Sequence, residues 1–104
     1  MVLYICKWDI RPEKTSDYPT WAKSAIQRIF AVPGVLEFRG YRPASGSHEV
    51  AVTYEFKDMN SWATWMSNDD VKKVWAEAHL YCENMYSELW GPSPVTPKPI
   101  HSGK

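Results

Sequence analysis

Residues 48–57 have the sequence His-Glu-Val-Ala-Val-Thr-Tyr-Glu-Phe-Lys, the clearest strand pattern in the chain. Two sets of residues alternate along it: Val50, Val52, Tyr54 and Phe56 on one side, and Glu49, Ala51, Thr53 and Glu55 on the other. Successive side chains of a strand point to opposite faces, so the alternation predicts a β-strand with one strongly apolar face. The other face is only weakly polar at Ala51 and Thr53, which matters for assembly.

Two more strands and a helix are predicted on the N-terminal side of this strand. Residues 2–10 are rich in the β-branched and aromatic side chains that favour strands. From Tyr18 to Ala31 the apolar side chains recur at i, i+3, i+4 and i+7, which predicts a helix ended by Pro33-Gly34. Residues 35–42 alternate weakly, and the short turn at 43–47 predicts an antiparallel hairpin with the strand described above.

Two helices and a last strand are predicted on the C-terminal side. A capping residue precedes each helix: Asp58 comes before residues 60–66, and Asn68 or Asp69 comes before a helix over about 70–85. A final extended segment is expected over about 86–90, where Gly91-Pro92 ends it.

The order strand, helix, strand, strand, helix, strand predicts an α+β fold of the ferredoxin-like βαββαβ kind. Both helical regions then cover one face of an antiparallel sheet. We expect one domain over residues 1–90 and a Pro-rich C-terminal tail over residues 91–104, which holds four of the eight prolines. Such a tail cannot form a helix or a central strand, so it is either disordered or laid across a neighbouring molecule.

The uncovered face of this sheet is too apolar to be fully solvated. A second copy packed sheet to sheet would cover it and close a barrel, so we expect a homodimer, a dimeric α+β barrel. The alternative is a monomer with a mildly apolar face.

Three stretches resemble a known family. They are Val32-Pro33-Gly34-Val35, Val52-Thr53-Tyr54-Glu55-Phe56-Lys57-Asp58 and Ser61-Trp62-Ala63-Thr64-Trp65-Met66-Ser67-Asn68-Asp69-Asp70-Val71. With the strand order they make the chain similar, over residues 1 to about 90, to the dimeric α+β barrel proteins of the antibiotic-biosynthesis-monooxygenase-like group. That group includes cofactor-free monooxygenases of aromatic polyketides, haem-degrading enzymes, isomerases, decarboxylases and proteins with no known reaction.

The chain departs from this group at several functional positions. Several members place a His where this chain has Trp65, and another near Asp70. The haem-degrading members share Trp65, but they need an Asn on the first strand and an iron-ligating His on the long helix. Here the first strand offers Cys6-Lys7-Trp8, and the helix offers Val74-Trp75-Ala76. The resemblance therefore places haem binding or degradation third among the functions considered.

His79 is the candidate catalytic residue, because an imidazole at a pocket rim can act as a general base. It lies at the edge of the predicted helix stripe, with Glu83 at i+4 as a partner that could orient it. A surface His paired with Glu83 is the competing interpretation. The candidate ligand-pocket residues are Tyr54, Trp62, Trp65 and Trp75. Core and dimer packing would use the same aromatic side chains.

Composition excludes several other functions. The 12 basic and 12 acidic residues balance, so we expect neither nucleic acid nor membrane as a partner. The three histidines lack metal-site spacing, and no metal or bound cofactor is expected. Cys6 and Cys82 are expected as reduced thiols of a cytoplasmic protein, since the N-terminus lacks the features of a signal peptide.

The leading functional hypothesis is an enzyme of the antibiotic-biosynthesis-monooxygenase-like type. It would act on a small aromatic or apolar compound in a pocket between sheet and helices, with no cofactor. The alternative is a non-catalytic homodimeric protein that binds a ligand or serves assembly.

Overall fold

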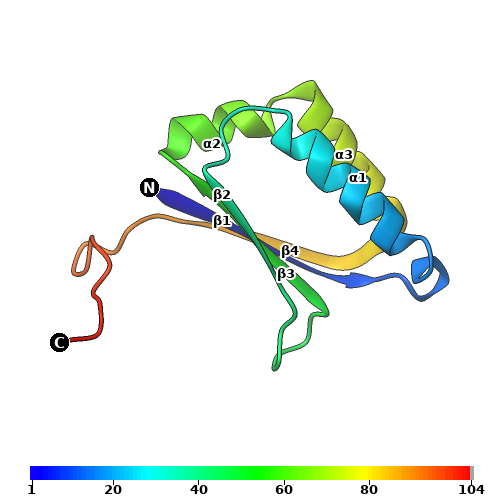
Figure 1. Ribbon diagram of the computed structural model, residues 1–104, viewed down its shortest axis with the longest axis horizontal. Coiled ribbons are helices and arrows are strands. Elements are labelled where there is room, and N and C mark those ends of the chain that lie inside the picture. Colours follow the sequence, from blue (N-terminus) through cyan, green and yellow to red (C-terminus); the bar gives the residue numbers. More distant parts are fainter. Residues whose placement is uncertain (104) are drawn as a thin grey trace.

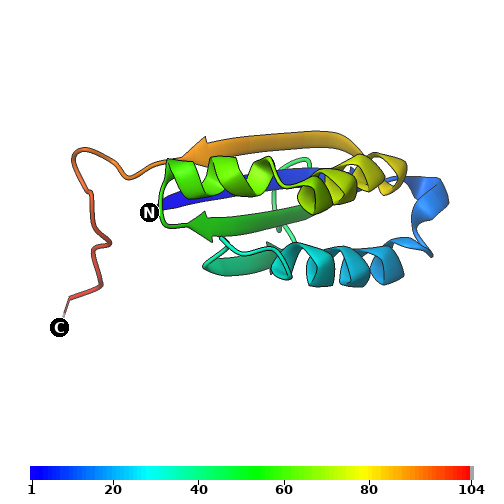
Figure 2. The ribbon, with the colours of Figure 1, turned by 90° about the horizontal axis from the view of Figure 1, so that it is seen from above.

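The computed structural model describes residues 1–103, which form one four-stranded antiparallel sheet with three α-helices on one of its faces (Figure 1). The elements in chain order are β1 (Val2–Ile10), a 3-10 turn (Pro12–Lys14), α1 (Tyr18–Phe30), β2 (Glu37–Tyr41), β3 (Val50–Phe56), α2 (Met59–Met66), α3 (Asp69–Tyr81) and β4 (Cys82–Trp90). The strand order is β2-β3-β1-β4. This is the ferredoxin-like α+β fold that the element order predicts, with the helices lying over the strands (Figure 2).

Local chemistry fixes where α2 and α3 begin. The Asp58 carboxylate accepts a hydrogen bond from the backbone N–H of Ser61 at 2.8 Å, which caps α2. The Asn68 side chain accepts from the N–H of Asp70 at 2.8 Å, which caps α3. Both caps were expected from the sequence, and for α3 the structure selects Asn68 over the alternative, Asp69.

The boundary between α3 and β4 differs from the prediction. The helix ends at Tyr81, about four residues early, and the strand begins at Cys82. Cys82 and Met85 fit a helical stripe in the sequence, but antiparallel pairing with β1 begins at Ile10↔Cys82. The pairing provides hydrogen-bond partners for backbone N–H and C=O groups of β1 and β4. The helical spacing of Cys82 and Met85 is a weaker signal, because two residues can match it by chance. Asn84 takes a positive φ of 53° beside an irregularity in the register.

The core lies between the sheet and the helices. Phe56 of β3 and Val71 of α3 are 0% exposed, and Trp65 of α2 packs on Phe56 with ring centroids 5.2 Å apart. Gly34, before β2, has a φ of +129°, and a Cβ there would meet the Cβ of Trp65 at 3.7 Å. Glycine is favoured here because this backbone conformation strains other residues.

A polar cluster joins α1 to α3 at the surface. The Glu77 carboxylate accepts from the Arg28 guanidinium at 2.9 Å and from the Trp21 indole N–H at 3.0 Å. These hydrogen bonds lower the pKa of Glu77 to about 2, and the bond from the Arg28 guanidinium has the larger effect. The Trp21 ring also stacks on Tyr81 with centroids 4.8 Å apart. Charge and stacking together hold the two long helices side by side.

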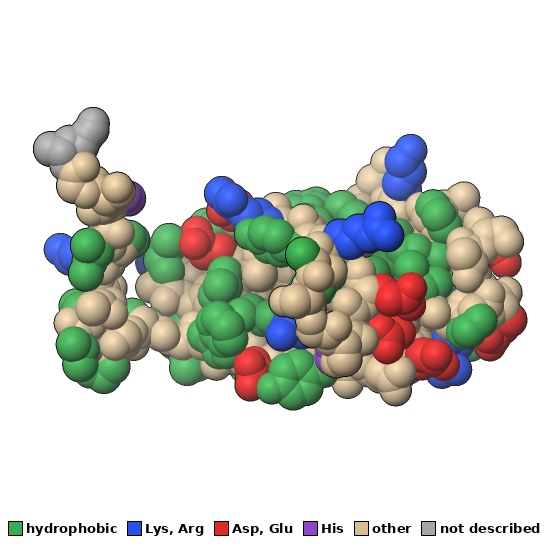
Figure 3. Space-filling model, turned by 90° about the horizontal axis from the view of Figure 1, so that it is seen from below, with side chains coloured by type: hydrophobic (Ala, Val, Ile, Leu, Met, Phe, Trp, Pro, Cys, Tyr) green, Lys and Arg blue, Asp and Glu red, His purple; other side chains and the backbone are tan. Residues whose placement is uncertain are grey.

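The face of the sheet that no helix covers is called the open face below, and Figure 3 shows it. By strand register and alternation it carries Leu3, Ile5, Lys7, Glu37, Arg39, Tyr41, Ala51, Thr53, Glu55, Tyr86, Glu88 and Trp90. The Glu88 carboxylate accepts hydrogen bonds from the Tyr86 hydroxyl and, at 3.1 Å, from the Trp90 indole. Apolar and charged side chains are thus mixed on this face, with Ile5 only 6% exposed and Trp90 52% exposed.

Residues 91–103 follow β4 and are exposed throughout. They run away from the sheet at the end where β4 finishes (Figure 1). Val95 in this segment is 87% exposed, so the segment contributes nothing to the core of the chain. Among the described residues, no helix is long and apolar enough to cross a bilayer.

Candidate functional site

An apolar cavity of about 70 Å³, called the inner cavity below, lies between the sheet and helices α1 and α3. Its lining includes Trp8, Tyr54, Val74 and Trp75, together with small side chains of α1. An apolar cavity that binds benzene has a volume of about 150 Å³, so this one is too small for an aromatic ring while the surrounding side chains keep their positions. Burial raises the pKa of the Tyr54 phenol well above its usual value.

A second hollow of about 200 Å³ opens between α3 and the β1–β4 half of the sheet, and it is called the outer pocket below. Its lining residues are Tyr4, Cys6, Lys7, Trp8, Trp75, His79, Met85, Tyr86 and Ser87. Aromatic rings form part of the wall, and a phenol, a thiol, a hydroxyl and an imidazole provide polar atoms. The outer pocket therefore contains groups of the kinds that chemistry on a small molecule requires.

Most polar groups of the outer pocket are neutral at pH 7. Burial raises the pKa of the Cys6 thiol to about 12. Burial also raises the pKa of the Tyr4 phenol, and the nearby Ser87 hydroxyl partly opposes that rise. Thiol, phenol and hydroxyl can thus donate hydrogen bonds to a ligand but are poor bases. The remaining group with a nitrogen that can accept a proton in this lining, apart from Lys7, is the imidazole of His79.

His79 lies on α3, exposed at the rim of the outer pocket. Its backbone carbonyl accepts from the Arg11 side chain at 3.0 Å, which anchors the last turn of α3. The expected i+4 relation to Glu83 does not hold, because the helix has ended and Glu83 lies in β4. The Glu83 carboxylate pairs instead with Arg11 at 3.5 Å. The Glu83 carboxylate is thus engaged by Arg11 rather than set to orient the imidazole.

The structure separates the four predicted pocket residues. Tyr54 and Trp75 line the inner cavity, and Trp75 also lines the outer pocket. Trp62 and Trp65 of α2 line neither hollow. The Trp62 ring packs on Tyr4 at 5.6 Å, and the Trp65 ring packs on Tyr54 at 5.1 Å. Sheet and α2 therefore bring aromatic rings together around Tyr4 and Tyr54, but only part of this cluster borders a space.

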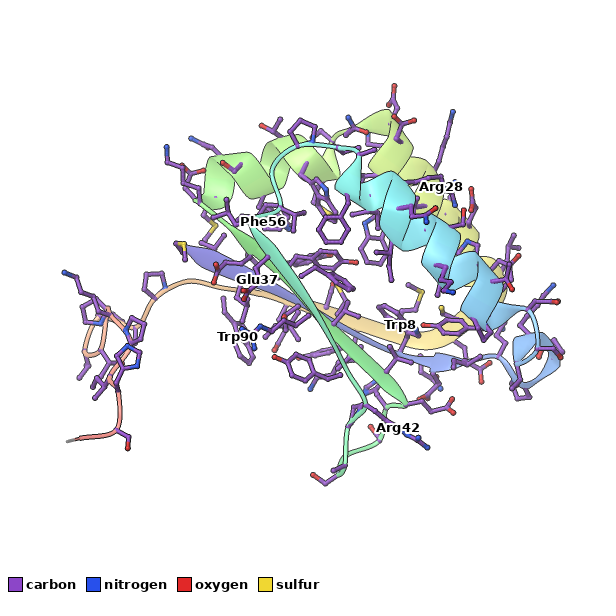
Figure 4. All side chains as sticks on the ribbon, in the orientation of Figure 1. Trp8, Arg28, Glu37, Arg42, Phe56 and Trp90 are labelled. Atoms are coloured by element: carbon purple, nitrogen blue, oxygen red, sulfur yellow. The ribbon has the colours of Figure 1, made fainter. Side chains whose placement is uncertain are left out.

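The indole N–H groups divide the six tryptophans into two sets of three. In Trp8, Trp21 and Trp90 the N–H donates to Tyr18, Glu77 and Glu88, respectively. In Trp62, Trp65 and Trp75 the N–H is buried without an acceptor among the described residues. Figure 4 shows Trp8 on the helix side of the sheet with Phe56, and Trp90 on the other side. The unpaired set belongs entirely to α2 and α3.

Sequence reasoning did not single out Tyr4, Cys6, Met85 and Ser87 as pocket residues. The alternation of β1 places Tyr4, Cys6 and Trp8 on one face, so part of the signal was available. Ser87 lies within the predicted last strand, but its pairing with Cys6 of β1 was not predicted, and Met85 was assigned to the preceding helix. Among residues 1–103, no group of three or more His, Cys, Asp or Glu side chains could hold a metal ion.

Comparisons with known proteins agree with this architecture. The family model described as antibiotic biosynthesis monooxygenase matches residues 1–77 of the chain. No curated protein matches the sequence.

Three solved structures illustrate the likeness of fold. A dabb family protein with a ferredoxin-like fold from Mesorhizobium loti has a TM-score of 0.79 at 14% identity, over 88% of this chain and 96% of that one. A dimeric ferredoxin-like protein of unknown function from Thermobifida fusca has a TM-score of 0.72 at 13% identity, over 86% and 88%. SnoaB, a cofactor-independent oxygenase from Streptomyces nogalater, has a TM-score of 0.73 at 7% identity, over 93% and 97%. At such identities the likeness concerns the fold alone.

Proposed function

The chain belongs to the antibiotic biosynthesis monooxygenase family, and from this membership we propose that it is a monooxygenase-type enzyme for a small aromatic or apolar compound. The reaction would take place in the outer pocket and would need no bound cofactor. The observation that carries the proposal is the placement of His79 at the rim of a pocket with aromatic walls and neutral hydrogen-bond donors. A fold shared with a cofactor-independent oxygenase supports it.

The proposed chemistry begins with a proton transfer. The His79 imidazole removes a proton from a methylene carbon that an adjacent aromatic ring and carbonyl make acidic. The resulting carbanion gives electrons to dioxygen, a C–O bond forms, and the returning proton completes a hydroperoxide. Loss of water then leaves a ketone, so that one methylene group and one dioxygen become one carbonyl group and one water. Tyr4 and Ser87 would donate hydrogen bonds to the oxygen that carries the developing negative charge.

We also propose that the working unit is a homodimer joined through the open face. Leu3, Tyr41 and Trp90 expose apolar surface there, and burying it against a second copy would remove that surface from water. One of the similar solved structures is described as dimeric, which supports this arrangement. Sedimentation of the wild type beside a variant with a charge on the open face tests it.

A non-catalytic, ligand-binding homodimer is the second candidate. It is favoured by the engagement of Glu83 with Arg11, which leaves this carboxylate unavailable to orient His79 as a base. Haem binding or degradation is the third candidate, and the site fits it poorly. The helix region equivalent to that of the iron-ligating His is Val74-Trp75-Ala76, which contains no His, and the outer pocket of about 200 Å³ is far smaller than a haem.

The test compares the protein with its His79→Ala and His79→Gln variants on a panel of small aromatic ketones and hydroxyarenes. Products are analysed by mass spectrometry under isotopically labelled dioxygen, and binding is measured separately. If His79 is the base, both variants lose about 10²–10⁴-fold in kcat while ligand affinity changes little. Full turnover by His79→Ala would remove His79 from the mechanism. Binding without turnover across the panel would favour the ligand-binding alternative.

A further inference from the structure

The inner cavity and the outer pocket are separated by two tryptophan side chains. Trp8 of β1 and Trp75 of α3 each line both hollows. A space of about 70 Å³ therefore lies directly behind the wall of a space of about 200 Å³. Binding sites for small molecules usually have volumes of about 300–1,000 Å³, so neither hollow reaches that range alone. The two hollows together, with one indole moved aside, would reach that range.

The two tryptophans of this wall are held very differently. The Trp8 indole donates to the Tyr18 hydroxyl at 3.0 Å, and the ring is 8% exposed. The Trp75 indole N–H is buried without an acceptor among the described residues. Its ring meets Tyr4 and Tyr54 nearly edge-on, with centroids 6.4 and 6.3 Å away. Trp8 is thus a fixed part of the wall, whereas the Trp75 ring is held by packing alone within residues 1–103.

An unpaired N–H makes the present position of Trp75 costly. A buried donor without a partner costs roughly 1–3 kcal/mol relative to one that is hydrogen-bonded. Moving the indole out of the wall toward solvent, where Trp75 is already partly exposed, would bring its N–H into contact with water or a ligand oxygen. Some of the packing lost by turning would be offset by this hydrogen bond.

We infer that Trp75 is a movable partition whose displacement joins the two hollows into one chamber for a flat, amphipathic ligand. The inference concerns the site of the proposed function and rests on it. The inner cavity is lined by apolar side chains such as Ile29, Val52 and Val74, so it would receive an apolar ring. The outer pocket would hold the polar end among Tyr4, Ser87 and His79. The ligand class is a fused two-ring arene with one hydroxyl or carbonyl oxygen, in preference to a single ring.

The test uses binding, which needs no turnover. Naphthalen-1-ol serves as the two-ring probe and phenol as the one-ring probe, both titrated calorimetrically. Trp75→Ala removes the partition, so naphthalen-1-ol should bind about tenfold more tightly, as expected when a conformation populated at about 10% becomes permanent. Phenol should bind the variant as it binds the wild type, because it needs only the outer pocket.

Two further variants keep the inference falsifiable if Trp75→Ala folds poorly. Trp75→Phe leaves a smaller ring in the wall, so naphthalen-1-ol should bind more tightly than to the wild type but less tightly than to Trp75→Ala. Trp8→Phe is the matched control in the fixed part of the wall. The ratio of its affinities for naphthalen-1-ol and phenol should stay near the ratio of the wild type. Equal preference for the two probes in all variants would overturn the inference.

Nuclear magnetic resonance gives an independent readout. In the free protein the indole N–H signal of Trp75 should be broadened by exchange on the microsecond-to-millisecond scale, while that of Trp8 stays sharp. Addition of naphthalen-1-ol should sharpen the Trp75 signal. A Trp75 signal as sharp as that of Trp8, with and without the probe, would show a fixed ring and contradict the inference. If the probe preference holds but no product forms, the enzymatic proposal fails and the partition stands.

Discussion

The two faces of the sheet are built from neighbouring residues yet differ in chemistry. On β3 the side chains of Val52, Tyr54 and Phe56 point toward the helices and are buried, whereas Thr53 and Glu55 between them lie on the open face and are half-buried. The helices complete the first face with one continuous core. The second face has no cover within residues 1–103, although Ile5 is already almost shielded from solvent. A period of two residues thus gives each strand one face that the helices cover and one that no described residue covers.

The largest expected effect is on the helix-covered face. Replacing Phe56 by Ala should lower the free energy of unfolding by about 3–5 kcal/mol, because a fully buried ring is lost and a cavity remains. Thr53→Ala on the open face of the same strand should cost less than about 1 kcal/mol. Chemical denaturation of the two variants at equal protein concentration measures both values. Similar losses at Phe56 and Thr53 would abolish the distinction between the two faces.

The next effect is on assembly. Thr53→Lys places a charge at the centre of the open face, next to Arg39 in the register, and a sheet-to-sheet dimer would bury that charge without a partner. We expect dimer dissociation to become at least about 100-fold more favourable, with a folded monomer remaining. Analytical ultracentrifugation against Thr20→Lys, an exposed change on α1, provides the measurement and its control. If the wild-type protein is monomeric at high concentration, the proposal that the open face is a dimer interface is wrong.

The smallest effect tests how the helix layer is held together. The pKa of Glu77 lies near 2, below its ordinary value of 4.5, so the Glu77 carboxylate stabilises the fold above pH 4.5 and this contribution disappears as the pH falls toward 2. Because the Arg28–Glu77 pair is more than one-third exposed, Glu77→Gln should cost only about 1 kcal/mol at pH 7. The difference from the wild type should shrink progressively in thermal unfolding between pH 4.5 and pH 2. A difference that does not change with pH would indicate lost packing rather than lost charge.

The sequence predicted the fold well because its signals are local. Apolar and polar side chains alternate clearly over residues 48–57. The caps Asp58 and Asn68 mark where α2 and α3 begin through short-range hydrogen bonds. The prediction was wrong at the end of α3, where Cys82 and Met85 fit both a helix and a strand. Only pairing with β1, some 70 residues earlier in the chain, decides between the two.

The candidate site was less accessible to sequence reasoning than the fold. His79 and Trp75 were singled out from their residue types, and the structure places both at the outer pocket, although their roles stay predictions. Trp62 and Trp65 carried the same aromatic signal but line neither hollow. Tyr4 and Ser87 border the outer pocket because β1 and β4 pair side by side, which no residue pattern within one segment specifies.

The sequence alone predicts the order of the elements, the apolar face of β3 and the cap of α2, and it narrows the cap of α3 to Asn68 or Asp69. These features depend on side-chain periodicity and on hydrogen bonds spanning a few residues. The boundary between α3 and β4 depends on tertiary contacts. So do the hydrogen-bond acceptors of the tryptophan indoles and the position of Trp75 between two hollows. These outcomes arise from contacts between residues far apart in the chain, because a space or an unpaired donor exists only once all its neighbours are in place.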